Sequence, residues 1–228
     1  MFVTGMGGRM PNDIVDESVS TQASAYMGVV GIVQALAVGM LLEHAEFFQL
    51  LVSGKIDVAS GEFLLAFFQA TVVFQLIVLT WHMNLQNVIA FKRAFGMWDS
   101  YIPFSFVFAE YYLARNASPE RFWQWELSVL VFMVCALFAF THVYFVARKN
   151  LARNKAVLDR LGTYPFWVRI CVFAMALLSI AGLLIDGHDM APKLVLAGLL
   201  DVSIFAFMFI NTHFFWMRLI SAENLLRG

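Results

Sequence analysis

Two carboxyl groups stand inside long apolar stretches of this 228-residue chain, where an ionisable side chain is costly. Glu110 and Asp201 are each surrounded by aliphatic and aromatic residues. A charged side chain at the centre of a bilayer costs roughly 2.5–3.5 kcal/mol on insertion scales, so it normally faces a bundle interior or a watery cavity. We therefore predict that both residues lie on a route for ions or protons. Structural hydrogen bonding between helices is the alternative.

A second group of ionisable residues follows the first apolar stretch. Glu43, His44 and Glu46 combine carboxylates with an imidazole, which can form a cation entry site, a proton relay or a hard-metal site. The alternative is an ordinary helix end that meets water at the membrane boundary. The same side of the membrane is expected to carry Asp186, His188 and Asp189.

Three histidines close three apolar stretches in similar phrases, which read Thr-Trp-His, Phe-Thr-His and Asn-Thr-His. We expect His82, His142 and His213 to lie at a similar depth. Two histidines on facing helices could hold the iron of haem b, and three could bind a transition metal or pass protons. The alternative is that each is an amphipathic side chain near the lipid headgroups. No HExxH or HxxH pair places two ligands on one helix.

Small and amide-bearing residues suggest how the helices pack. Gly31, Ala35 and Gly39 form a small-xxx-small stripe, which allows close helix approach in lipid. Amide side chains in apolar stretches are expected to form hydrogen bonds between helices. These side chains are Gln34, Gln69 and Gln75.

The composition defines the class of protein in which these residues must be positioned. Hydrophobic residues make up 61% of the chain and charged residues 14%, against about 45–50% and 25% in ordinary soluble domains. Mean hydropathy is +0.75. These values predict an all-α integral membrane protein whose first partner is the lipid bilayer. The net charge of −1 gives no basis for nucleic-acid binding.

Six transmembrane helices are predicted, with five as the alternative, because about 20 apolar residues span a bilayer. The third is arguable, since it is short and holds Pro103 and Glu110. Six spans separate Lys and Arg between the two sides better than five, which favours a cell (inner or plasma) membrane protein with both termini cytoplasmic. The predicted spans are 26–51, 63–91, 97–114, 123–147, 165–185 and 194–217.

The spans form one predicted transmembrane domain, 25–222. It follows a polar cytoplasmic segment, 1–24, and precedes a short cytoplasmic tail, 223–228. The basic loop 148–164 is expected to extend the fourth helix or to lie on the cytoplasmic leaflet, with a solvated loop as the alternative.

Three functional interpretations follow from these features. The first is a homo-oligomer that forms or gates a permeation path for ions, protons or small solutes. The second is a haem- or quinone-binding subunit of a membrane redox complex, and the third is an anchor or assembly partner for other membrane subunits. The chain lacks GxSxG and HExxH motifs, which favours a protein that is not an enzyme.

Overall fold

The computed structural model describes residues 11–54, 57–91, 97–185 and 189–226. These residues form helices and short connections, with no strand among them. Five segments are long and apolar enough to cross a membrane, which confirms the prediction of an all-α polytopic bundle. The elements are α1 (Pro11–His44), α2 (Glu46–Ser53), α3 (Gly61–Ala90), α4 (Met97–Arg115), η1 (Pro119–Arg121), α5 (Phe122–Lys149), α6 (Leu151–Leu161), α7 (Tyr164–Leu183) and α8 (Met190–Leu226).

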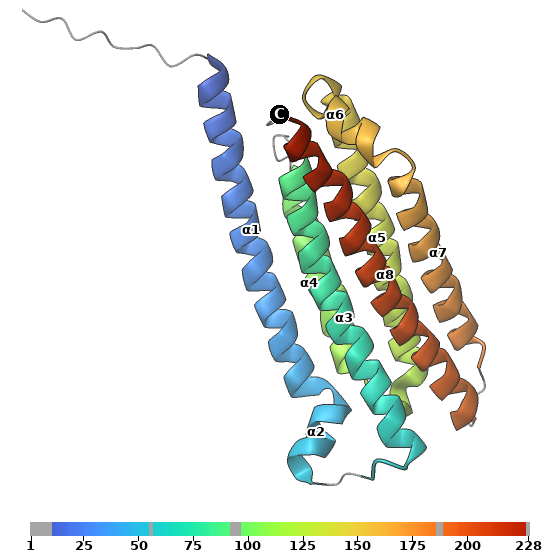
Figure 1. Cartoon of the computed structure of the whole chain (residues 1–228). Coiled ribbons are helices and arrows are strands. Elements are labelled where there is room, and N and C mark those ends of the chain that lie inside the picture. The colour runs from blue at the N-terminus through green and yellow to red at the C-terminus, as the bar shows by residue number, and fades with distance from the viewer. Residues whose placement is uncertain (1–10, 55–56, 92–96, 186–188, 227–228) are drawn as a thin grey trace, which may run out of the picture.

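Helix α3 lies at the centre of the bundle (Figure 1). It packs against α1, α4 and α8, while α5 packs against α4 and α7. In the most apolar stretch of α3, 61% of the residues are buried, whereas the corresponding share is 28–39% in the other four apolar helices. Polar side chains on α3 are therefore shielded from lipid by protein, and they must find partners on neighbouring helices.

Helix α4 covers the segment for which the number of spans is arguable. Its 19 residues correspond to about 28 Å at 1.5 Å per residue, close to the thickness of the hydrocarbon core. It runs alongside α1 and α5. It is not one of the five helices that are apolar enough to span on composition alone.

Several element boundaries differ from the expected spans. Helix α1 begins at Pro11, well before residue 26, and breaks at Ala45, whose backbone is extended. The backbone N–H of Glu46 donates to the Ala117 carbonyl, 3.1 Å away, so the start of α2 is tied to the end of α4. Segment 148–164 contains the separate helix α6, and α8 continues to Leu226.

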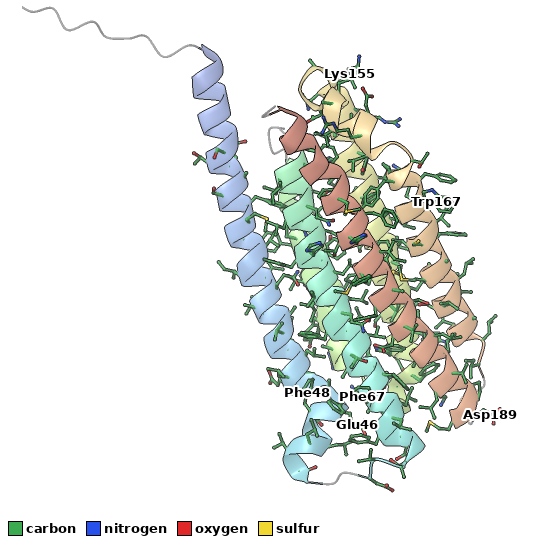
Figure 2. All side chains as sticks on the ribbon, viewed as in Figure 1. Glu46, Phe48, Phe67, Lys155, Trp167 and Asp189 are labelled. Atoms are coloured by element: carbon green, nitrogen blue, oxygen red, sulfur yellow. The ribbon has the colours of Figure 1, made fainter. Side chains whose placement is uncertain are left out.

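The two ends of the bundle differ in their short helices. The start of α1, the end of α8 and helix α6 lie at one end, and α2 lies at the other (Figure 1). Figure 2 places Lys155 of α6 at the first end, and Glu46 and Asp189 at the opposite end. We call these the α6 end and the α2 end.

A glycine near the α2 end allows α7 to approach its neighbours closely. A Cβ added to Gly182 would lie 2.6 Å from Cδ of Glu126 on α5 and 2.6 Å from Cδ2 of Leu196 on α8. Real Cβ atoms do not occur at such distances, so a side chain at this position would force the buried ends of Glu126 and Leu196 to shift.

Replacing Gly182 with Ala is expected to destabilise the bundle, because overpacking a tight helix contact costs about 1–3 kcal/mol. The matched control is Gly198→Ala on α8, since a Cβ on Gly198 would lie 3.8 Å from the Phe68 ring, an ordinary van der Waals contact. Thermal unfolding in detergent should show a lower Tm for the first variant and an unchanged one for the second. Equal melting temperatures would contradict the close packing at Gly182.

Candidate functional site

Polar residues of α3 form two stripes on nearly opposite sides of the helix. At 3.6 residues per turn, residues 69, 80, 84 and 87 share one side and residues 75, 82 and 86 share the other. We call the first set the cavity stripe and the second the α8 stripe. The cavity stripe consists of Gln69, Thr80, Asn84 and Asn87, and the α8 stripe of Gln75, His82 and Gln86.

The residue of the α8 stripe nearest the α2 end, Gln75, contacts Asp201 on α8, one of the two predicted intramembrane carboxylates. The amide nitrogen of Gln75 donates to Oδ1 of Asp201 at 2.9 Å. Asp201 is half-buried between α8 and α3. The expectation that Gln75 bonds between helices is confirmed, and its partner is the carboxylate that lacked one in the sequence.

The other two residues of the α8 stripe, His82 and Gln86, belong to a network of hydrogen bonds that joins three helices. Nε2 of His82 lies 2.9 Å from the amide nitrogen of Gln86 and 3.1 Å from the hydroxyl of Thr212 on α8. Asn211 donates to Oε1 of Gln86 at 3.1 Å and accepts from the hydroxyl of Tyr164 on α7. This network holds α3, α7 and α8 together toward the α6 end.

The cavity stripe faces the most deeply buried of the predicted site residues, Glu110 on α4. The Glu110 side chain has no exposed surface. Its Oε1 accepts a hydrogen bond from the amide of Gln34 on α1 at 3.4 Å, and Thr80 is its second polar neighbour. Oε2 has no hydrogen-bond partner among the described residues. Three helices therefore surround one carboxyl group with an incomplete set of partners.

A cavity of about 60 Å³ lies beside this group, in the middle of the bundle. Its polar lining comes from Thr80, Asn84 and Asn87 of the cavity stripe, and its apolar wall includes Phe106, one turn before Glu110. This volume has room for a few water molecules. Thr80 thus connects the Glu110 carboxyl group to a small space that holds further polar side chains.

Two more hydrogen bonds connect the cavity stripe to its surroundings. The hydroxyl of Tyr26 on α1 donates to Oδ1 of Asn84 at 2.5 Å. Toward the α2 end, the Gln69 amide donates to the Ser118 carbonyl at 3.3 Å, which confirms its expected role as a structural link. The cavity stripe is therefore anchored to α1 and to the connection after α4.

A second fully buried carboxyl group, Glu126, lies between α5 and α7. Neither of its oxygens has a hydrogen-bond partner among the described residues, and Ser179 is its polar neighbour. No described Lys, Arg or His side chain pairs with Glu126 or Glu110. Glu126 stands at the start of a predicted span, but nothing in its spacing indicates that both of its oxygens are enclosed.

The three histidines lie in different surroundings. His82 belongs to the network described above, whereas Nε2 of His142 lies 3.7 Å from a carboxylate oxygen of Asp99. His213 is exposed and stacks on Phe209. The described residues contain no group of three His, Cys, Asp or Glu side chains able to hold a metal ion. No observation in the described part of the chain favours the interpretation as a haem- or quinone-binding subunit.

The predicted cluster around residue 44 lies at the break between α1 and α2. Glu43 is exposed, while His44 and Glu46 are half-buried. The His44 ring packs edge-on against Tyr111 of α4, with 6.0 Å between the ring centres. Asp189 is exposed at the same α2 end, and Asp186 and His188 lie outside the described residues.

The small-residue stripe of α1 is not used for packing within the described part of the chain. A Cβ on Gly31 or Gly39 would meet no atom within 4 Å, and Ala35 is exposed. Gly31 and Ala35 border a groove of about 240 Å³ between α1 and α3. Close approach by another helix would have to come from outside this chain.

Comparison with known proteins finds no matching protein family, curated protein or solved structure. The fold and its polar centre define the chain as an all-α, multi-pass bundle of the membrane type. Its centre is an apolar-lined cavity with an enclosed carboxyl group beside it.

Replacing Asn211 with Ala is expected to destabilise the protein, because it removes partners from both Tyr164 and Gln86. Interhelical hydrogen bonds in membranes contribute about 0.5–2 kcal/mol each, so we expect a loss of about 1–2 kcal/mol. His213→Ala, two residues along the same helix but at an exposed position, is the control. Unfolding in a denaturing detergent should separate the two variants, and equal stability would contradict the network.

Proposed function

We propose that this protein conducts protons or small cations through the bundle, with Glu110 as the group that takes up and releases the proton or cation. The observation that carries the proposal is the enclosure of Glu110. Its carboxyl group is fully buried, accepts a hydrogen bond from one amide, and has one oxygen without a partner in the part of the chain that the structure describes. It adjoins the cavity through Thr80. Intramembrane carboxyl groups in such settings commonly mark ion paths and proton relays.

The chemistry follows from what each neighbour can do. An ionised carboxylate without a counter-charge is expensive in the membrane, whereas the neutral acid is tolerated. Glu110 would therefore give up its proton only to a water that reaches it. A cation would bind the carboxylate by taking the proton's place while that water carries the proton away. The Thr80 hydroxyl donates to the Leu76 carbonyl at 2.9 Å, so it can accept a hydrogen bond as it stands and would pass a proton only after turning away from Leu76. Waters in the cavity can continue the relay past Asn84 and Asn87 toward the α6 end.

The predicted residues at the α2 end fit this scheme as a collecting surface. Glu43, His44 and Glu46 would attract cations from solution before they enter the bundle. Asp201 would act beside this route, because its carboxylate is already bonded by Gln75.

We further propose six spans with both termini on the cytoplasmic side of a cell membrane. The length of α4 and its position between α1 and α5 support its crossing. Positive charges gather at the α6 end, where exposed residues include Arg148, Lys149, Lys155 and Arg160. Lys and Arg accumulate on the cytoplasmic side of membrane proteins, so the α6 end is assigned to the cytoplasm.

Proton flux into liposomes tests the central proposal. With pyranine inside the vesicles and a potassium gradient made conductive by valinomycin, the wild-type protein should acidify the lumen faster than empty vesicles. Glu110→Gln keeps the size of the side chain and an oxygen that accepts from Gln34, but it cannot exchange a proton. The rate should therefore fall at least about tenfold, as for removal of an essential general acid–base. Thr80→Val should reduce the rate less.

The matched control is Glu120→Gln, which neutralises an exposed glutamate on η1 and should leave the rate unchanged. Asp201→Asn retains an oxygen for Gln75 and should have a small effect. A wild-type rate equal to that of empty vesicles would contradict the proposal for protons. Repeating the assay with sodium and potassium dyes would then decide the case for cations.

The chain is also proposed to form a homo-oligomer through the small-residue stripe of α1. Replacing Gly31 and Gly39 with Leu is expected to reduce the assembly to monomers, because small residues are what allow helices to approach closely in lipid. Val29→Leu, exposed but outside the stripe, is the control. Light scattering after size-exclusion chromatography measures the mass, and a monomeric wild-type protein would contradict this proposal.

A further inference from the structure

We propose that the groove between α7 and α8 at the α6 end binds one anionic phospholipid. Its acyl chain would occupy the groove, and its phosphate would lie among the exposed basic residues of α6. Val168 and Phe207 line both this groove and the central cavity, whereas Thr80 lines the cavity alone and Glu110 does not line the groove.

The groove has a volume of about 340 Å³, within the range of small-molecule binding sites. Its apolar walls include Trp167 and Cys171 on α7 and Phe214 on α8. Its floor contains Tyr164 and Asn211, whose polar groups are already bonded to each other. The groove therefore offers apolar surface to a flexible chain and makes few polar demands on it.

One end of the groove is polar and open to water. Thr163, exposed at the start of α7, lines it. Arg160 lies three residues earlier, on the last turn of α6, and its side chain is exposed. Figure 2 shows Lys155 of α6 and Trp167 of α7 toward the same end of the molecule. A headgroup above Trp167 would thus meet basic side chains.

The positive charge at the α6 end favours anionic lipids over neutral ones. Between residues 148 and 160 the chain has one acidic side chain, Asp159, against five basic ones, which are Arg148, Lys149, Arg153, Lys155 and Arg160. Helix α6 packs against α5 and α8, so these charges are held over the bundle end. Basic clusters next to membrane helices attract anionic headgroups, and a groove with apolar walls adds a place for the chain.

Trp167 provides the test, because it lines the groove and is 59% exposed. The full chain is placed in phosphatidylcholine vesicles with brominated phosphatidylglycerol or, in parallel, with brominated phosphatidylcholine. The difference in quenching between wild type and Trp167→Phe reports the lipid at the groove. We expect brominated phosphatidylglycerol to quench this component several times more strongly at equal mole fraction.

Replacing Lys155 and Arg160 with Gln should abolish this several-fold preference, because each basic charge near the membrane surface can account for up to about a fivefold difference in affinity. Arg121→Gln removes one positive charge at the α2 end and should leave the preference intact. Cys171→Phe fills the groove and should reduce quenching by both lipids. Equal quenching by the two lipids in the wild-type protein, or a preference that survives in the Lys155/Arg160 variant, would overturn the proposal.

Discussion

The structure depends on the need of the central helix to pair its polar side chains without help from water. In the hydrocarbon core an unsatisfied polar group costs several kcal/mol. Helix α3 carries seven such side chains in its two stripes, and most are bonded to another helix or to the connection after α4. These bonds link α3 to α1, to α8 and to the connection after α4.

Under the same constraint, polar groups whose donors and acceptors are paired differ from those that are left without a partner. Around Asn211, donors and acceptors match, and the network joins three helices. Around Glu110 they do not match, because one carboxyl oxygen has no partner among the described residues while a cavity lies nearby. Both oxygens of Glu126 also lack partners among the described residues, so an unpartnered oxygen alone does not mark Glu110. What distinguishes Glu110 is that Thr80, its polar neighbour, also lines the central cavity.

Much of this arrangement could be predicted from the sequence. Composition and apolar length indicate an all-α membrane bundle, and the amides of Gln34, Gln69 and Gln75 do bond outside their own helices. The spacing of residues 69, 80, 84 and 87 also predicts the cavity stripe, since a 3.6-residue period can be recognised in the sequence. The hydrogen-bond partner that each side chain finds on another helix cannot be predicted in this way. A similar depth was expected for the three histidines, but rotation about each helix axis decides which side chains face each other, and His213 is exposed.

Glu110 lies on α4, the helix whose membrane crossing is the hardest to predict from composition. Helix α4 contains Pro103, Asp99 and Glu110 and is not among the helices that are apolar enough to span on composition alone, which is why its crossing is arguable. Its two carboxyl groups, on Asp99 and Glu110, are nevertheless buried against protein. The carboxyl groups of α4 face protein, while large side chains such as Phe104 and Phe108 are exposed on its outer face. A helix can therefore hold buried carboxyl groups, and a lower hydropathy, and still present an apolar face to lipid, which is consistent with a sixth crossing.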